Sequence, residues 1–147
     1  MDLLSPTLEI SGSGLRAQRM RLDVIASNLA NATTTRTDAG GPYKRRSVVF
    51  AADAIDSDFG STLAGLSDEG AHQGVKVAEV VEDPDPPRMV FEPGHPDADA
   101  DGYVGYPNVN PVTEMVDLMT ATRAYEANVQ AINATKRMNE AALGIGG

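Results

Sequence analysis

The chain has 147 residues, which suits one domain of ordinary size or a small domain with extended arms. It carries 12 Lys and Arg against 21 Asp and Glu, and a net charge of -9 argues against nucleic acid or an anionic membrane surface as the main partner. The absence of cysteine excludes disulfides, zinc–thiolate sites and thiol catalysis. Aromatic residues make up only 5% of the chain, so a dense self-sufficient core is not expected.

Neither a membrane span nor a cleaved secretory signal is expected. No apolar run approaches the length that crosses a bilayer, so we do not expect the chain to be an integral membrane protein. The first residues lack the basic segment and the uninterrupted apolar segment of a conventional signal peptide.

The charge is distributed unevenly along the chain. Residues 1–46 hold seven basic and four acidic residues, whereas residues 47–107 hold two basic and thirteen acidic residues. Residues 108–147 hold three basic and four acidic residues, and seven of the nine prolines lie between residues 42 and 107. The pattern predicts two nearly balanced helical arms around an acidic, turn-rich centre.

The N-terminal arm has the apolar spacing of a helix, most clearly over residues 14–30. Alternating steps of three and four, as in a coiled-coil seam, run through seven positions, of which five are large and apolar: Leu8, Leu15, Leu22, Ile25 and Leu29. The other two positions are Ser11 and Gln18. Ser5 and Pro6 suit an N-cap and a first helical position. The Asn and Thr residues over 31–35 are expected to end the helix, because their side chains compete for backbone hydrogen bonds.

The sequence pattern in the centre of the chain predicts a small antiparallel hairpin with long loops. The strands are expected at 43–52, after the turn at Gly40 and Gly41, then around 75–81 and over 88–91. Residues 53–74 are acidic, rich in Gly and Ser and weakly patterned, so we expect a loop there.

The C-terminal arm has the strongest helical pattern in the chain. The same spacing runs through Met115, Leu118, Thr122, Tyr125, Val129 and Ile132, all large and apolar except Thr122. Val112, Val116 and Met119 widen the stripe near its start. Asn110 and Pro111 suit an N-cap and first position, and Glu114 places negative charge near the positive end of the helix dipole. Gly144, Gly146 and Gly147 are expected to end the helix.

The expected fold is mainly α with a small β region, in which the terminal helices pair as a coiled-coil-like arm. Three segments follow: an N-terminal helix over 1–34, an extended centre over 35–108 and a C-terminal helix over 109–147. Each arm alone would be marginal in water, because its apolar stripe would stay exposed. Periodicity favours pairing of the arms within one chain, as in a self-contained helical hairpin, and pairing with further copies stays open.

A short acidic motif suggests calcium binding. Asp97-x-Asp99-x-Asp101-Gly102 matches the first half of a calcium loop, but its twelfth position is Asn108 and nearby prolines exclude flanking helices. An acidic turn is the simpler interpretation. A soluble acidic calcium-binding module remains as an alternative from a different functional class.

Other motifs carry no catalytic hypothesis. Gly12-x-Gly14-x-x-Ala17 resembles a dinucleotide fingerprint, but no strand precedes it. His72 and His95 lack a third ligand at suitable spacing for zinc. We therefore expect no catalytic, cofactor-binding or metal-ligating residues, no cofactor and no enzyme activity.

Signatures near both ends of the chain resemble those of bacterial flagellar rod and hook proteins. Ser13-Gly14-Leu15, Ala17 and Ser27-Asn28-Leu29-Ala30-Asn31-Ala32-Thr33-Thr34 are similar to the family's N-terminal signature, and residues 119–128 to its C-terminal signature. Further stretches narrow the resemblance to proximal-rod proteins: residues 41–46, 93–98, 102–104 and 106–110.

The resemblance implies a structural subunit of the flagellar basal-body rod, the torque-transmitting drive shaft of motility. Such a subunit self-assembles through its terminal helices with its own copies and with other rod proteins. It is exported by the flagellar type III apparatus without a cleaved signal and lies in the rod that spans the periplasm. The resemblance therefore favours packing of the arms between subunits. Another axial protein of the same family is the nearest alternative.

The residues expected at the subunit interface are the apolar residues of the two arms. They are Leu8, Leu15, Leu22, Ile25, Leu29, Met115, Leu118, Met119, Tyr125, Val129 and Ile132. Asn31, Gly40 and Gly41 are expected to form a hinge between the helical arms and the centre.

Overall fold

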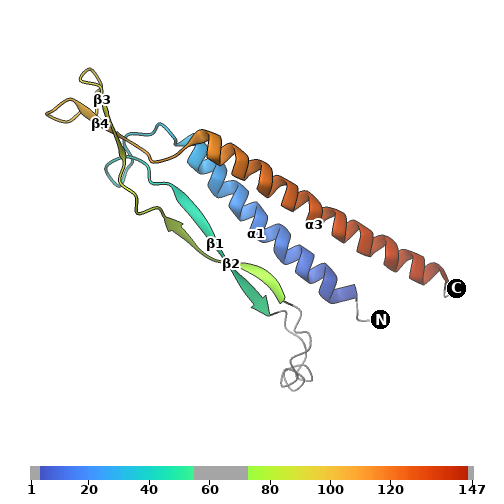
Figure 1. The fold of residues 1–147 in the computed structure, drawn as a ribbon. Coiled ribbons are helices and arrows are strands. Elements are labelled where there is room, and N and C mark those ends of the chain that lie inside the picture. Colours follow the sequence, from blue (N-terminus) through green and yellow to red (C-terminus); the bar gives the residue numbers. More distant parts are fainter. Residues whose placement is uncertain (1–3, 55–72, 146–147) are drawn as a thin grey trace. The chain divides into compact units, whose positions relative to one another are not determined.

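A computed structural model of the chain describes residues 4–54 and 73–145. The described elements, in chain order, are α1 (Leu4–Ala30), β1 (Arg46–Ala54), β2 (Gln73–Glu82), β3 (Arg88–Phe91), β4 (Tyr103–Tyr106) and α3 (Pro111–Ile145) (Figure 1). The fold is mainly helical with a small β region, as the sequence predicts. Most of the loop expected at 53–74 lies outside the described residues.

The chain divides into two compact units. Unit 1 comprises Met1–Met20, Phe50–Ala78 and Thr122–Gly147, and unit 2 comprises Arg21–Val49 and Glu79–Ala121. In unit 1 the first part of α1 runs antiparallel to the later part of α3. In unit 2 the last turns of α1 run antiparallel to the first turns of α3, and this unit also contains β3 and β4.

Helix α1 ends where the sequence predicts but begins earlier. The amide of Asn31 still donates to the Ser27 carbonyl at 3.1 Å, and then the backbone leaves the helix. Because α1 begins at Leu4, Ser5 lies inside the first turn, and its prediction as the N-cap is wrong. Pro6 is tolerated there, since the first-turn amides have no helical partner for proline to remove.

Helix α3 begins with the predicted cap and continues past one of the glycines expected to end it. The Asn110 Oδ1 atom accepts hydrogen bonds from the amides of Val112 at 3.0 Å and Thr113 at 3.5 Å. The helix continues to Ile145, so the prediction that Gly144 ends it is wrong. A glycine so close to a helix end costs about 1 kcal/mol at most and does not stop the helix. Gly146 and Gly147 lie outside the described residues.

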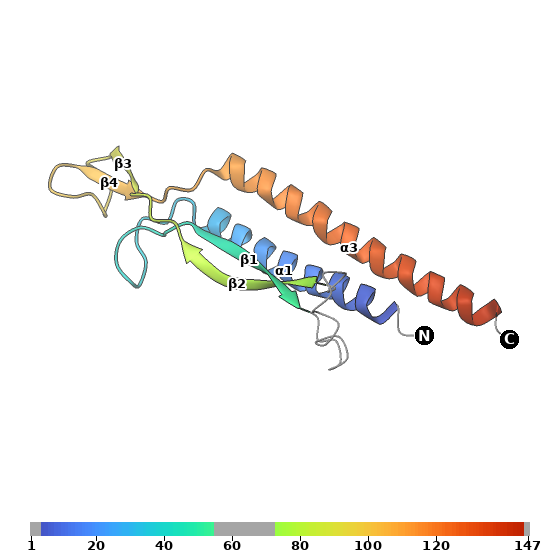
Figure 2. The same cartoon turned by 60° about the horizontal axis from the view of Figure 1, so that its bottom comes forward.

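The β region contains two antiparallel two-stranded sheets, where the sequence predicts a single hairpin. Strand β1 pairs with β2, and Figure 2 shows the two strands side by side in opposite directions. Strand β3 pairs with β4 through Arg88↔Tyr106, Met89↔Gly105, Val90↔Val104 and Phe91↔Tyr103. The sequence analysis predicts no strand over residues 103–106, because four residues that include a glycine give too short a pattern.

Many fully buried positions on the helices are occupied by small or polar residues. On α1 these include Gly14, Ala17 and Asn28, whereas the predicted seam residues Leu15, Leu22 and Leu29 are only half-buried. On α3, Glu114, Ala121 and Thr135 are buried at heptad spacing. The buried line on α1 therefore lies next to the line of large apolar residues, which keep part of their surface exposed.

The two helices contact each other in each unit. In unit 1 a Cβ atom built on Gly14 would come within 2.9 Å of the Asn128 Oδ1 atom, so the glycine permits a close approach. In unit 2 the Asn28 amide donates to the Glu114 carboxylate at 3.1 Å. In each unit the helices therefore approach each other through a small or polar residue of α1.

Candidate functional site

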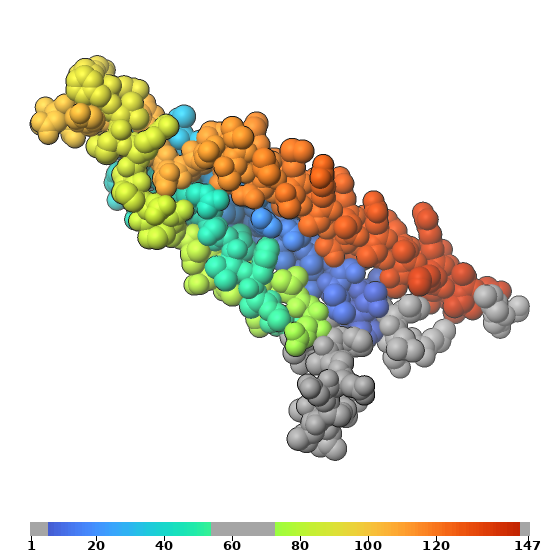
Figure 3. All heavy atoms as spheres, in the orientation of Figure 1, coloured from blue at the N-terminus to red at the C-terminus, as the bar shows by residue number. Residues whose placement is uncertain are grey.

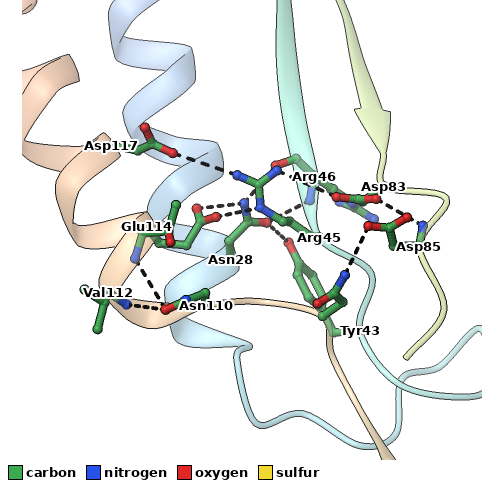
Figure 4. A network of polar contacts seen from close by, with 12 residues as sticks. Asn28, Tyr43, Arg45, Arg46, Asp83, Asp85, Asn110, Val112, Glu114 and Asp117 are labelled. Atoms are coloured by element: carbon green, nitrogen blue, oxygen red, sulfur yellow. Dashed lines mark hydrogen bonds and ion pairs between the residues drawn. The ribbon is translucent and has the colours of Figure 1, made fainter. Parts of the chain in front are cut away.

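A buried carboxylate, Glu114, is the centre of a polar network in unit 2 (Figure 4). It lies in the first turn of α3 and its side chain is almost completely inaccessible to solvent. The Arg45 Nε atom donates to Glu114 Oε1 at 2.7 Å, and the Asn28 Nδ2 atom donates to Glu114 Oε2 at 3.1 Å. Both carboxylate oxygens are thus satisfied, as a buried charge requires.

The Asn28 side chain joins the last turns of α1 to the start of β1. Its Nδ2 atom donates to the Arg46 carbonyl at 2.8 Å, and its Oδ1 atom accepts from the Arg46 amide at 2.9 Å. These two bonds reproduce the pattern that a backbone residue of a neighbouring strand would make. The Tyr43 hydroxyl donates to the same Oδ1 atom at 3.0 Å. The amide therefore serves as a short substitute for a strand at the edge of β1.

Arg45 extends the network to three acidic side chains. Besides Glu114, its guanidinium lies 3.8 Å from Asp83 and 3.9 Å from Asp117. Arg21 of α1 also pairs with Asp117, at 3.7 Å. The network connects α1, α3 and the segments that flank β1 and β2 within unit 2. It holds these segments in fixed register.

The acidic motif around Asp99 forms a turn instead of a cation site. The Asp99 Oδ1 atom accepts hydrogen bonds from the amides of Asp101 at 3.0 Å and Tyr103 at 2.8 Å. Asp97 accepts a hydrogen bond from the Thr35 hydroxyl at 2.8 Å and pairs with Arg36 at 3.7 Å. Over residues 4–54 and 73–145, no group of three His or acidic residues is placed to hold a metal ion. The calcium-binding alternative is not supported.

One titratable group near the hairpin has a perturbed pKa. The Tyr106 hydroxyl donates to the Glu92 carboxylate at 3.0 Å, and this bond raises the pKa of the phenol above its ordinary value. Burial and the negative charge of Glu92 raise it further, against the opposing charge of Arg88. The bond therefore stabilises the protonated tyrosine across the whole neutral range.

The expected interface residues differ in exposure. On α1, Ile25 is buried, and the four leucines, Leu8, Leu15, Leu22 and Leu29, are half-buried. On α3, Leu118, Tyr125, Val129 and Ile132 are half-buried, whereas Met115 and Met119 are exposed.

The residues expected at the hinge lie in tight turns. Asn31 donates from Nδ2 to the Ser27 carbonyl at 2.9 Å and accepts from the Thr34 hydroxyl at 3.1 Å. Gly40 and Gly41 have φ values of 85° and 76°, a conformation that favours glycine.

The exposed methionines belong to a continuous apolar stripe at the start of α3, which we call the α3 stripe. It consists of Val112, Met115, Val116 and Met119, spaced so that they share one face of the helix, with exposed fractions of 54–68%. Figure 3 shows the first turns of α3, in orange, open on the surface. Four large apolar residues together on one face are more than a scatter of single exposed side chains, and they indicate an interaction surface.

Comparison with known proteins identifies the family. A family model described as flagella basal body rod protein matches residues 8–36, and one described as flagellar basal body rod FlgEFG protein C-terminal matches residues 100–145. The chain is 44% identical to the flagellar basal-body rod protein FlgC of Borreliella burgdorferi, over 99% of this chain and 98% of that protein. It is 47% identical to FlgC of Bacillus subtilis, over 95% and 96%, and 45% identical to FlgC of Salmonella typhimurium, over 94% of each.

The chain belongs to the FlgC family of flagellar basal-body rod proteins. The two regions matched by family models contain most of α1, from Leu8 onward, with the turn that follows it, and β4 with α3. They include Asn28 and Glu114, which meet in the network. No helix among the described residues of this FlgC-family chain is long and apolar enough to cross a membrane.

Sequence reasoning alone missed the network residues Asn28, Arg45 and Glu114. Asn28 and Arg45 lie in stretches that carry the family resemblance. Nothing in the local sequence indicates that Asn28 meets Glu114, because these two residues are 86 positions apart. The sequence pattern also gave no signal for Glu114, because the predicted apolar stripe passes through Met115 and Leu118, and the burial of Ala121 at the same heptad position as Glu114 becomes evident only in the structure.

Proposed function

We propose that this chain is a structural subunit of the proximal flagellar rod that self-assembles through its terminal helices into the torque-transmitting drive shaft for motility. The observation that carries the proposal is kinship with FlgC proteins at 44–47% identity over nearly the whole chain. Those relatives are named as rod proteins, which favours a structural role over an enzymatic one. The surface of α3 supports the same proposal, since its stripe is available for a partner.

The arrangement of side chains explains how helices of this kind could build a shaft. Small residues such as Gly14 permit close approach within the chain, while Leu15, Leu22 and Leu29 keep part of their apolar surface exposed. Further subunits would cover that surface and the α3 stripe. Closely packed interfaces deform little under load, which suits the transmission of torque.

The proposal extends to partners and location. The partners are copies of this chain, other rod proteins and the flagellar type III export apparatus, and the location is the basal-body rod across the periplasm, reached without a cleaved signal. Residues 1–34 and 109–147 would form an inner tube and residues 35–108 would lie outside it. Asn31, Gly40 and Gly41 would form the bend between them.

A charge placed on the apolar side of α1 tests the proposal. In a strain that lacks its own FlgC, Leu22→Asp should be expressed and exported at normal levels but should not restore basal-body rods or swimming in soft agar. Ala26→Asp is the matched control, because it adds the same charge at an exposed position of the same helix. Normal motility with Leu22→Asp would overturn the packing assignment.

A second measurement compares the free and assembled states. The exposed apolar surface of the arms should make the isolated chain much less helical than the chain in an assembled rod. Circular dichroism of the purified chain and of isolated rods would measure the difference. Equal helicity together with a protease-resistant monomer would favour a self-contained helical hairpin.

A further inference from the structure

A second apolar surface lies on the hairpin of β3 and β4. Antiparallel pairing places Met89, Phe91 and Tyr103 on one face, and their exposed fractions are 54%, 61% and 43%. The rings of Phe91 and Tyr103 contact each other edge to face, with centroids 5.3 Å apart. The opposite face carries Val104, which is completely buried. We call the three exposed residues the hairpin patch.

The turn before β4 leaves room for the Phe91 ring to lie against the backbone. Gly102 has a φ of 82°, and a Cβ atom there would come within 2.9 Å of the ring and 3.2 Å of Pro93. The Glu92 amide also donates to the Gly102 carbonyl at 2.9 Å. The patch is therefore a shaped surface held by the backbone, because two aromatic side chains are fixed beside a glycine that cannot readily be replaced.

The hairpin patch and the α3 stripe do not cover each other within one chain. Both belong to unit 2, and all seven of their side chains are exposed. Figures 1 and 2 show the hairpin beyond the first turn of α3, away from the helices of that unit. Two apolar surfaces displaced along one unit are suited to bind each other in different copies.

We propose that the hairpin patch of one copy packs on the α3 stripe of the next copy, in a head-to-tail contact. The inference rests on the proposed function and names the contact that would propagate the assembly. A heterologous contact whose rotation does not close generates an open helical filament, whereas a contact of one surface with itself gives a closed dimer. A shaft requires the first kind, and two different complementary surfaces on one chain supply it.

The size of the two surfaces agrees with polymerisation and not with a stable free dimer. Burying the exposed parts of the seven side chains would remove on the order of 700 Å² from water, if a large side chain offers about 150–200 Å². Stable pairwise interfaces bury about 1,200–2,000 Å². One such contact is therefore weak alone, and it becomes effective only when each copy makes other contacts in the same assembly.

Charge at the borders of the two surfaces favours the same pairing. The turn next to the hairpin patch carries exposed Asp99 and Asp101. On α3, Arg123 follows Met119 at the next position of the same face, and among the described residues it makes no ion pair. Docking of the patch on the stripe would bring opposite charges to the rim of the contact.

Engineered disulfides test the proposal, and the absence of native cysteine makes every cross-link interpretable. The double variant Phe91→Cys with Val116→Cys is expressed in the strain that lacks its own FlgC, and purified basal bodies are oxidised and separated without reductant. A head-to-tail contact predicts a ladder of dimers and larger species. A mixture of copies that carry one cysteine each should stop at dimers, and either single variant alone should stay monomeric.

The outcomes separate this inference from the proposed function. If the double variant assembles and swims but gives no ladder, the contact is refuted and the rod function stands. Dimers from Phe91→Cys alone would show a symmetric contact and refute the head-to-tail arrangement, as would a product that joins the chain to a different protein. Absence of the wild-type chain from basal bodies would instead refute the proposed function. A second pair, Tyr103→Cys with Met119→Cys, replaces the first if that variant does not assemble.

Discussion

Asn28 illustrates how one side chain can connect segments that are distant in the sequence. Its amide makes both backbone hydrogen bonds of Arg46 and also donates to the buried Glu114 carboxylate. The pattern needs two donated bonds and an accepting oxygen, and a hydroxyl group has only one donor, so no other small side chain fulfils it. A carboxylate in the same place could only accept hydrogen bonds.

Asn28→Asp should therefore destabilise unit 2, by about 2–4 kcal/mol at pH 7, because it removes two donated bonds and places a second carboxylate beside Glu114. The neighbouring negative charge raises the pKa of the introduced carboxyl in the folded state above its unfolded value. The loss of stability should be small below a pH of about 4, the pKa of the introduced carboxyl in the unfolded chain. It should grow as the pH rises through the higher pKa of that carboxyl in the folded state. Urea unfolding of the purified wild-type and variant chains at pH 3 and pH 7 would measure it.

Asn31→Asp is the control for that prediction. The Asn31 amide donates only to the Ser27 carbonyl among the described residues and faces no carboxylate in the network. Its replacement should cost about 1 kcal/mol or less and depend weakly on pH. Equal, pH-independent losses for the two variants would show that the network does not confine the Asn28 amide as described.

Gln18 in unit 1 contrasts with Asn28, because one of its polar atoms has no partner within the described part of the chain. Its Oε1 atom is buried, and among the described residues it has no hydrogen-bond partner. Gln18→Leu should leave the free energy of unfolding unchanged or raise it by about 0.5–2 kcal/mol, because an unsatisfied acceptor is replaced by an apolar group of similar size. The same change at exposed Gln130 should stay within about 0.5 kcal/mol. Thermal unfolding followed by circular dichroism would compare them, and a clear loss from Gln18→Leu would imply a partner for the oxygen.

At the scale of the elements, glycine has different effects at two nearby positions of α1. A Cβ atom on Gly12 would meet only the end of the Arg16 side chain, at 4.0 Å, whereas on Gly14 it would press on Asn128. The Asn128 amide cannot easily move away, because it also donates to the Ala124 carbonyl at 2.9 Å. Gly14 therefore has a packing role that Gly12 does not share.

Gly12→Ala should raise the free energy of unfolding by up to about 1 kcal/mol, the usual gain in helix propensity. Gly14→Ala should not show that gain, because the added Cβ atom clashes with Asn128. Its free energy of unfolding should be lower than that of Gly12→Ala by about 1 kcal/mol or more. Urea unfolding of both variants under one condition would measure the difference. Equal stabilisation by the two changes would contradict the close approach of the helices in unit 1.

The helices and three of the four strands follow from local sequence patterns. Apolar periodicity predicts both helices, and Asn110 with Pro111 predicts the start of α3 because a cap acts on its nearest neighbours. The buried line on α1 was not predictable, since Leu15 and Leu22 dominate the pattern while close packing selects Gly14 and Ala17. Strand β4 depends on pairing with β3 and gives little signal alone.

At the scale of the whole molecule, the excess negative charge is concentrated in the segment between the two helices. The segment 47–107 holds thirteen acidic and two basic residues, whereas the arms are nearly neutral. Copies with a net charge of -9 repel one another, and this repulsion opposes association through apolar surfaces.

Salt should therefore strengthen self-association of the purified chain. At about 0.5 M NaCl the Debye length falls to about 4 Å, which screens the repulsion while leaving apolar contacts intact. Sedimentation velocity at low and high salt should show a larger associated fraction at high salt. Met119→Asp, which places a charge on the α3 stripe, should reduce association at both concentrations. Weaker association at high salt would mean that ion pairs, and not apolar surfaces, hold the copies together.

The bond between Asn28 and Arg46 has a consequence for which substitutions the chain tolerates. Asn28 recognises only the main chain of residue 46, and the exposed Arg46 guanidinium contributes a surface pair with Glu82 and a contact with the face of the Tyr43 ring, 5.9 Å from its centroid. Almost any residue except proline could therefore occupy position 46, whereas position 28 should accept very few. In a saturation library selected for swimming, these directly bonded positions should show opposite mutational profiles.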